Sequence, residues 1–370
     1  MRIGINTRSL LGQKMEGFGN YTLEIVKRLT IAHPEHTFIC YFDRPVDPQF
    51  SFGPNVICKS VFPPTRHPFL YIIWFQWRLK RAIQKDQLDV FWSPDGMFPL
   101  GMKTPVLATI HDLNFEHYPK DLPRLVSWYY RKYFPRFAQQ ASHLISVSQT
   151  TKEDIMATYS IADSKISVIY NGVNTSYQPL DAAAKNRIRE KHGLSKPYFL
   201  FVGSLHPRKN IHRLITAFEA FAQADHTFEL VIVGSTMWKG TALQLSPTIA
   251  DRVQLKGHIS TEILAQIMAT ASAFVYVPYF EGFGMPLAEA MAAQTPIIAG
   301  DQSCLPEIAG PAALYVNPFD PGSITAAMHQ LKNDVALQTQ LVEAGQLRVK
   351  AFDWDQASKQ VWQALQNLVS

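Results

Sequence analysis

The chain has 370 residues, of which 47% are hydrophobic and 18% charged, and its formal net charge is +5. This composition excludes intrinsic disorder. The chain is too long for one ordinary hydrophobic core, so we expect two domains. The basic residues form no long run. The mild positive charge therefore suits anionic ligands or anionic lipid surfaces and does not indicate a nucleic-acid partner.

The cysteines and the apolar runs indicate a cytoplasmic protein. Cys40, Cys58 and Cys304 are odd in number, far apart along the chain and without a Cys-x-x-Cys pair, so neither a disulfide framework nor a zinc site is expected. The first ten residues read as a strand and not as a signal peptide. The apolar run from Pro68 to Trp77 is too short for a bilayer, which needs about 20 helical residues.

Short strands rich in branched and aromatic residues alternate with helical stretches along the first half of the chain. Alternation of this kind predicts a mostly parallel sheet with helices on both faces. We expect strands at 2–6, 37–42, 89–93, 105–111, 143–148 and 165–170, and helices at 19–31, 68–85 and 123–139.

The pattern breaks at a cluster of turn residues between Asn171 and Asp181 and then restarts after Lys196-Pro197. A helix over 182–194 falls within the break. Six further strands are expected at 198–203, 228–234, 252–257, 273–278, 295–300 and 312–317. The chain is therefore predicted to form two doubly wound α/β domains, residues 1–175 with a returning helix at 354–370, and residues 176–353.

Ligands of such sheets bind beyond the carboxyl ends of the strands, so the turns there are the places to look for a site. The most informative turn is "YFEGFGMPLAEAM", Tyr279 to Met291. Its glycines allow close backbone approach, and Pro286 favours a helix that begins near Met285, which makes an anion site. Glu281 and Glu289 would accept sugar or ribose hydroxyls. A solvated Glu289 beside a plain loop is the alternative, and the motif is not a dinucleotide fingerprint.

Two other turns carry polar or glycine-rich motifs. Arg208 and Lys209 follow a strand and precede Asn210, a predicted helix cap, and two adjacent cations suit a pyrophosphate. A merely solvated pair is the alternative. Gly17 and Gly19 form a close-approach turn before a helix expected to start at about Asn20.

A histidine and an acidic pair need a separate interpretation. His111 lies at the carboxyl end of a strand, a position suited to a functional histidine. The alternative is a structural histidine whose ring nitrogens make only local hydrogen bonds. Asp353-Trp354-Asp355 could hold a metal, but its place at the start of a terminal helix favours capping.

In combination these motifs resemble the retaining GT-B glycosyltransferases of the large group 1 family, which has a Glu-x7-Glu signature. The resemblance covers nearly the whole chain. It rests on "EGFGMPLAE", "VGSLHPRKN", "GFGNYT", "IHDLNFEHYP", "VIYNGVNT" and "FDWDQAS". It implies two Rossmann-like domains that face a central cleft, with a C-terminal helix that crosses back to the first, acceptor-side domain.

The resemblance also implies residue roles. Arg208 and Lys209 would hold the diphosphate, Glu281 and His111 the donor sugar, and Glu289 the ribose. His111, Arg208, Lys209 and Glu281 form the expected catalytic set. The implied donor-binding set is Gly17, Phe18, Gly19, Gly203, Ser204, Ile259, Phe283, Gly284, Met285, Pro286, Leu287 and Glu289.

The resemblance implies a nucleotide-sugar donor, a glycan or lipid-linked glycan acceptor, and no cofactor or metal. GDP-mannose is the expected donor, with UDP-glucose or another UDP-hexose as the alternative. A non-catalytic nucleotide-sugar-binding subunit is the alternative from another class, and an epimerase is a third. The stretch Pro68 to Lys85 is either a buried helix with cations at its end or a contact with the inner membrane surface. The segment Val233 to Gly240, with Trp238 and Lys239, departs from the family pattern, and its role stays open.

Overall fold

The computed structural model describes residues 1–12, 15, 17–234, 243 and 245–369. The chain forms two compact units, Met1–Gly172 with Asp353–Ser370, and Val173–Phe352. The first unit ends at Gly172 instead of at residue 175 as predicted. Most of Val233 to Gly240, including Trp238 and Lys239, lies outside the described residues.

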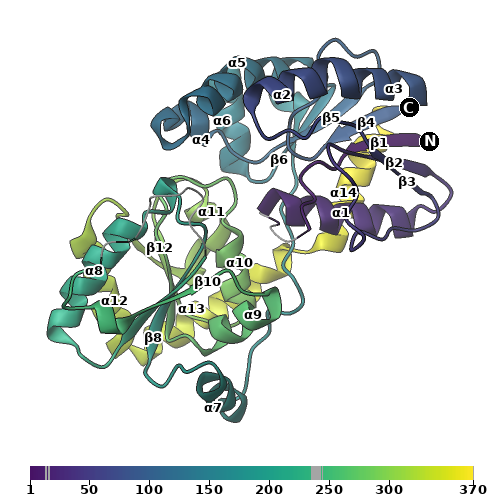
Figure 1. The fold of residues 1–370 in the computed structure, drawn as a ribbon. Coiled ribbons are helices and arrows are strands. Elements are labelled where there is room, and N and C mark those ends of the chain that lie inside the picture. Colours follow the sequence, from purple (N-terminus) through teal and green to yellow (C-terminus); the bar gives the residue numbers. More distant parts are fainter. Residues whose placement is uncertain (13–14, 16, 235–242, 244, 370) are drawn as a thin grey trace. The chain divides into compact units, whose positions relative to one another are not determined.

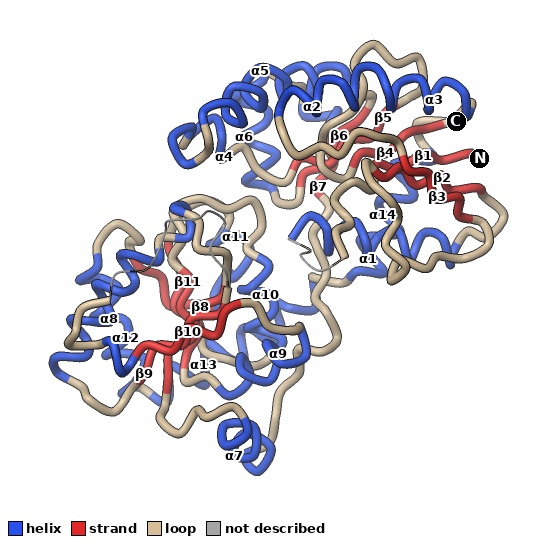
Figure 2. The backbone as a smooth tube through the Cα atoms, in the orientation of Figure 1, coloured by secondary structure: helices blue, strands red, loops and turns tan. Residues whose placement is uncertain are grey.

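Unit 1 is a parallel sheet covered on both faces (Figures 1 and 2). Its strand order is β3-β2-β1-β4-β5-β6-β7. The strands are β1 (Arg2–Asn6), β2 (Thr37–Phe42), β3 (Val56–Ser60), β4 (Val90–Ser93), β5 (Val106–Ile110), β6 (His143–Ser146) and β7 (Ile166–Val168). The helices are α1 (Gly17–Ala32), α2 (Pro68–Ile72), α3 (Lys80–Asp86), α4 (Asn114–His117), α5 (Arg124–Gln140), α6 (Gln149–Tyr159) and α14 (Trp354–Gln366).

The C-terminal helix α14 is part of unit 1, where it packs against α1. A Cβ atom added to Gly172 would lie 2.3 Å from the backbone nitrogen of Trp354, so the chain passes very close to the start of this helix. Asp353 caps the helix by accepting a hydrogen bond from the Gln356 amide at 2.7 Å. Asp355 pairs with Arg28 at 2.6 Å. The capping interpretation of Asp353-Trp354-Asp355 is therefore confirmed.

Three sequence expectations for unit 1 need correction. The edge strand β3 was not predicted, because its half-exposed residues lack a continuous apolar pattern. Helix α1 begins at Gly17 and not at Asn20. The predicted helix from Pro68 to Lys85 contains a π-helical segment, Ile73–Leu79, between α2 and α3, and this segment buries Trp74 and Phe75 side by side.

Unit 2 is a second parallel sheet, with strand order β10-β9-β8-β11-β12-β13. Figure 1 shows α8 and α12 on one face and α9, α10 and α13 on the other. The strands are β8 (Tyr198–Val202), β9 (Glu229–Val233), β10 (Val253–Gly257), β11 (Ala273–Tyr276), β12 (Ile297–Gly300) and β13 (Ala313–Val316). The helices are α7 (Ala182–Lys191), α8 (Ile211–Ala224), α9 (Thr261–Thr270), α10 (Met285–Ala292), α11 (Leu305–Ala309), α12 (Pro321–Asn333) and α13 (Val335–Arg348).

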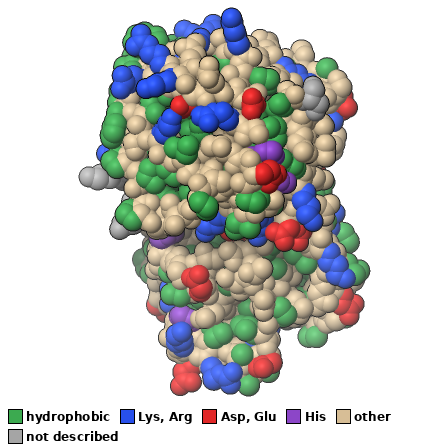
Figure 3. Space-filling model, turned by 90° about the vertical axis from the view of Figure 1, so that its right-hand side faces the viewer, with side chains coloured by type: hydrophobic (Ala, Val, Ile, Leu, Met, Phe, Trp, Pro, Cys, Tyr) green, Lys and Arg blue, Asp and Glu red, His purple; other side chains and the backbone are tan. Residues whose placement is uncertain are grey.

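The central strands of both sheets are short continuous apolar runs because helices cover both faces. All five residues of β5, β8 and β9 are buried. Across the described residues, no helix combines the length and the apolar character that crossing a bilayer would take. On the face drawn in Figure 3, hydrophobic side chains lie among the charged ones.

Candidate active site

The strand order brings two of the predicted motif turns together in unit 2. β8, β9 and β10 run toward one edge of the sheet, and β11 then returns to pair with the other side of β8. This reversal is a topological switch point, where open α/β sheets bind ligands at the carboxyl ends of the strands. The turn after β8 carries Arg208 and Lys209, and the turn after β11 carries Glu281. The Tyr279 amide donates to the Arg208 carbonyl at 3.1 Å and ties the two turns together.

Two cations and one carboxylate form the centre of this edge. Glu281 Oε1 lies 2.9 Å from Arg208 Nη1 and 2.5 Å from Lys209 Nζ. Lys209 Nζ also donates to the Tyr276 hydroxyl at 2.6 Å. Burial by itself would raise the pKa of Glu281, but the charges of Arg208 and Lys209 outweigh it and hold that pKa below its ordinary value. The Glu281 carboxylate is therefore ionised, and the formal charges of the three side chains sum to +1.

Both members of the shorter pair are buried. Lys209 is 8% exposed and Glu281 is 7% exposed. A lysine in this position needs a counter-charge, because burying an unpaired ammonium costs several kcal/mol. Glu281 provides that counter-charge. Its backbone is fixed by Ser303, whose hydroxyl donates to the Glu281 carbonyl at 2.6 Å.

Asn210 is at the start of α8 but does not cap it as predicted. It has a left-handed backbone with φ of 61°, and its side chain makes no cap hydrogen bond. Its side-chain nitrogen Nδ2 instead donates to the carbonyls of Val277 at 2.9 Å and Pro318 at 2.6 Å. Asn210 therefore joins the turn after β8 to the ends of β11 and β13, which positions the preceding Lys209.

Helix α10 begins at Met285, as predicted. Gly284 is its N-cap with φ of 80°, a conformation that favours glycine, and Pro286 occupies the first turn. Phe283 was predicted to contact the donor through its backbone, and Leu287 was predicted to belong to the donor site; the side chains of both are buried. Phe283 packs edge-to-face on Phe352 at 5.4 Å, and the Leu287 amide already donates to the Gly284 carbonyl at 2.9 Å. Leu287 therefore offers a ligand neither its side chain nor its amide.

Glu289 lies one turn into α10 and faces Tyr177. Desolvation raises the pKa of Glu289 to about 7, against the lowering effects of a hydrogen bond with Tyr177 and the charge of Lys209. Burial and the nearby Glu289 carboxylate likewise raise the pKa of Tyr177, so its hydroxyl stays protonated and donates. A carboxyl with this pKa changes charge near neutral pH, so its ability to accept ligand hydroxyls varies with pH.

The remaining predicted residues of unit 2 lie in turns after the strands. Gly203 and Ser204 follow β8, and Ile259 follows β10 in a half-buried position. A Cβ atom added to Gly234 would lie 1.9 Å from the Gly203 carbonyl oxygen. The turns after β8 and β9 therefore approach each other closely at two glycines, with no side chain between their backbones.

In unit 1, His111 follows β5 and is held by the turn after β4. His111 Nε2 lies 2.7 Å from the Pro94 carbonyl, which can only accept, so Nε2 carries the proton. Burial lowers the pKa of His111, against the raising effects of that bond and of nearby carboxylates. The ring is therefore neutral at pH 7, and Nδ1 is its hydrogen-bond acceptor. The ring packs edge-on against Tyr21, with centroids 5.0 Å apart.

The turn that holds His111 depends on residues that sequence reasoning missed. Asp95 pairs with Arg8 at 2.6 Å and accepts from Asn6 Nδ2 at 2.8 Å. Arg8 also lies over the Tyr71 ring, 5.3 Å from its centroid. β1 and β4 are neighbours at the switch point of this sheet, so Arg8 and Asp95 meet where their strands end. Arg8, a basic residue two positions after the end of β1, was the sequence feature that could have indicated this contact.

The predicted glycine turn of unit 1 lies in the first turn of α1. A Cβ atom added to Gly19 would lie 2.9 Å from the Ser9 carbonyl oxygen, so this position needs glycine for packing within the unit. At Gly17 an added Cβ would meet no described atom within 4 Å. Phe18, between them, is 40% exposed and lies 6.3 Å from the His111 ring.

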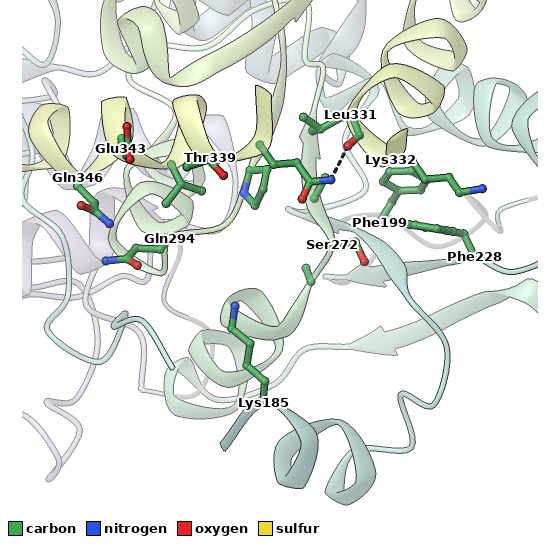
Figure 4. Close-up of a pocket in the computed structure, with 15 residues that line it drawn as sticks. Lys185, Phe199, Phe228, Ser272, Gln294, Leu331, Lys332, Thr339, Glu343 and Gln346 are labelled. Atoms are coloured by element: carbon green, nitrogen blue, oxygen red, sulfur yellow. Dashed lines mark hydrogen bonds between the residues drawn. The ribbon is translucent and has the colours of Figure 1, made fainter. Parts of the chain in front are cut away.

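Unit 2 also has a hollow at the opposite ends of its strands. The hollow has a volume of about 510 Å³ and is drawn in Figure 4. Phe199 near the start of β8, Ala273 at the start of β11 and Pro296 before β12 line it. It lies at the amino ends of the strands and contains none of the predicted site residues. Among the residues that the structure describes, no three His, Cys, Asp or Glu side chains gather as a metal site would require.

Comparisons with known proteins agree with this architecture. Residues 184–348 match the family Glycosyl transferases group 1, and residues 15–177 match Glycosyltransferase Family 4. O-antigen chain mannosyltransferase B of Escherichia coli is 25% identical over 94% of this chain and 94% of its own length. O-antigen chain mannosyltransferase RfbU of Salmonella typhimurium is 29% identical over 88% of this chain and 89% of its own.

A solved structure shows the same fold. Anabaena Alr3699/HepE in complex with UDP and glucose superimposes with a TM-score of 0.78 at 17% identity, over 99% of each chain. The Family 4 match lies within unit 1 apart from residues 173–177, and the group 1 match lies within unit 2. The chain is thus a GT-B glycosyltransferase that belongs to the group 1 family.

Proposed function

We propose that this glycosyltransferase moves mannose from GDP-mannose to a glycan or lipid-linked saccharide, with retention of anomeric configuration and without a metal ion. The observation that carries the proposal is the cluster of Arg208, Lys209 and Glu281 at the switch point of unit 2. Support for mannose comes from the two O-antigen mannosyltransferases, which this chain resembles over most of its length.

The proposed chemistry follows from the charges of the cluster. In transfer, the bond between the anomeric carbon and the diphosphate breaks, the acceptor hydroxyl oxygen bonds to that carbon, and the hydroxyl proton passes to the departing diphosphate. Negative charge grows on the departing diphosphate, and the fixed cations Arg208 and Lys209 would stabilise it. Glu281 would accept hydroxyls of the donor sugar, and Glu289 those of the ribose.

His111 would orient the donor sugar and not supply a proton. Its Nε2–H is committed to Pro94, so Nδ1 would accept a hydrogen bond from a sugar hydroxyl. No residue is assigned as a covalent nucleophile, because Glu281 is already the counter-ion of two cations.

A UDP-hexose donor is the alternative, favoured by the solved complex of HepE with UDP and glucose. Thermal melting with GDP, UDP, ADP, GDP-mannose and UDP-glucose, each with and without EDTA, separates the two. A ligand at 100 times its dissociation constant adds about 2.7 kcal/mol of stability. We expect a shift with guanine nucleotides alone that EDTA leaves unchanged, and release of GDP from GDP-mannose. A shift with uridine nucleotides alone would select the alternative, and no shift with any nucleotide would refute the site.

We further propose that α2, the π-helical segment and α5 contact a membrane surface that presents the acceptor. Trp77 is 62% exposed, Trp128 is 44% exposed, and α2 and α5 contact each other. Lys132 Nζ lies 4.8 Å from the centroid of the Trp128 ring, and Arg78 follows Trp77 in the chain. Apolar anchors with adjacent cations suit anionic lipid. Four cations from α5 and the preceding turn line a hollow of about 730 Å³: Lys120, Arg124, Arg131 and Lys132.

Flotation with anionic vesicles tests the membrane contact. We expect the chain to float, and Trp77→Ser with Trp128→Ser to remain at the bottom of the gradient. Leu347→Ser is the matched control, because this exposed apolar residue lies on α13 in unit 2. Equal flotation of all three proteins, or no flotation of the wild type, would refute the contact.

A further inference from the structure

Strands β2 and β3 bring two cysteines of unit 1 together, although 17 residues separate them in the chain. Cys40 of β2 is in direct register with Cys58 of β3. Neighbouring strands lie about 4.8 Å apart, which falls within the Cα separation of about 4.4–6.8 Å that disulfides span. Paired residues of adjacent strands point to the same face, so both thiols lie on one side of the sheet. Cys40 and Cys58 are therefore neighbours in the sheet despite their separation along the chain.

The two thiols have different surroundings. Cys40 is 0% exposed, whereas Cys58 lies exposed on the edge strand. The neighbouring Cys58 sulfur and burial raise the pKa of the Cys40 thiol, whereas the neighbouring Cys40 thiol lowers the pKa of Cys58. The accessible sulfur is therefore the one with greater thiolate character, which is the reactive form.

The sheet already holds both residues where a bond between them would form. β2 and β3 pair in unbroken register from Phe38↔Val56 to Phe42↔Ser60, so joining the sulfurs requires no sliding of one strand along the other. On the opposite face, Asp86 accepts from the Tyr41 hydroxyl at 2.6 Å and pairs with Lys59, next to each cysteine in the chain. These bonds fix the register independently of the thiols.

We propose that Cys40 and Cys58 are a reversible oxidation site at which hydrogen peroxide converts the two thiols into a disulfide. The Cys58 thiolate attacks one peroxide oxygen, the O–O bond breaks, and a sulfenic acid and one water form after proton transfer. The Cys40 sulfur then attacks the sulfenic sulfur, the S–O bond breaks, and a second water leaves. Two electrons pass from the thiols to the peroxide, and a dithiol reductant reverses the reaction. This proposal does not depend on the identity of the sugar donor.

The test uses the full chain with Cys304→Ser, which removes the third cysteine, a buried residue of unit 2. After peroxide, we expect loss of both remaining thiols, a non-reduced peptide that links residues 40 and 58, and full recovery with dithiothreitol. Retention of both thiols, or a disulfide that joins two chains, would overturn the proposal. Wild-type protein should lose two of its three thiols under the same treatment.

Single variants assign the roles of the two sulfurs. In Cys40→Ser, the Cys58 sulfenic acid should persist and react with dimedone, because its resolving partner is gone. In Cys58→Ser, Cys40 should resist peroxide because it is buried. Labelling of Cys40 in the second variant, or no labelling of Cys58 in the first, would contradict the assignment. Melting curves of the reduced variants establish that each is folded before oxidation.

Discussion

The charge cluster of unit 2 predicts that stability and diphosphate binding can be separated by two substitutions. Lys209→Met keeps the length of the side chain and removes its charge. Glu281 would then keep Arg208 at 2.9 Å but lose its 2.5 Å partner in a buried position. Breaking a buried ion pair on one side costs about 3–5 kcal/mol, and the remaining arginine places this case near the lower end. For a unit of this size, we expect a loss of about 6–12 °C in melting temperature.

The second substitution, Glu281→Gln, removes the buried carboxylate that has lost its closer partner. The double variant should therefore recover most of the melting temperature, because neither partner of the shorter pair remains charged. It should not recover diphosphate binding. One charge-assisted hydrogen bond contributes about 1.5–3 kcal/mol, so the dissociation constant for GDP should rise about 10–150-fold in both variants.

Calorimetric melting and titration with GDP, each on wild type, single and double variants, provide the measurement. Glu281→Gln alone is the control, since it keeps both cations. If the double variant bound GDP as tightly as the wild type, Lys209 would not be a diphosphate ligand. If Lys209→Met melted with the wild type, the pair would contribute nothing to stability, and the argument from burial would fail.

Four further outcomes are expected. GDP affinity should increase as pH rises through about 7, because the ionised form of Glu289 accepts both ribose hydroxyls, and Glu289→Gln, titrated in parallel, should show no such increase. His111→Ala should lower turnover about tenfold, the loss of one neutral hydrogen bond, while GDP affinity stays constant; equal losses in the two assays would make His111 structural. Gly19→Ala should lower stability by about 1–3 kcal/mol because its Cβ meets the Ser9 carbonyl. Gly17→Ala should melt like the wild type but raise KM for the donor, and an unchanged KM would remove Gly17 from the donor site.

Strands buried on both faces were predictable from the sequence, because continuous apolar runs mark such strands. β8 and β9 show this most clearly, since every residue of each is buried. β3 was not predictable in this way. It lies at the sheet edge, and its Cys58 and Ser60 face solvent. A strand of this kind is defined by its partner β2 and not by its own pattern.

The placement of Arg208, Lys209 and Glu281 after strand ends followed from local sequence, but their mutual contact did not. Contact required β8 and β11 to be neighbours, although 70 residues separate their last and first residues. The contributions of Tyr276 and Ser303 were missed for the same reason. Each touches the cluster from another strand or turn, and neither has a sequence feature that distinguishes it from an ordinary core or loop residue.

The arrangement also explains how a buried lysine can be kept ready for an anion. If both the diphosphate and Glu281 were absent, the buried Lys209 ammonium would lack a counter-charge, and the free-energy cost of burying it would destabilise the fold. Glu281 removes the cost, and Arg208 keeps the cluster at one net positive charge instead of zero. On the proposed function, an arriving diphosphate shares the cations with Glu281 and need not displace it. Glu281 Oε1 occupies only one side of each cation, and Arg208 and Lys209 each have several N–H donors. The same carboxylate would then stabilise the empty site and, through its remaining lone pairs, hold the donor sugar.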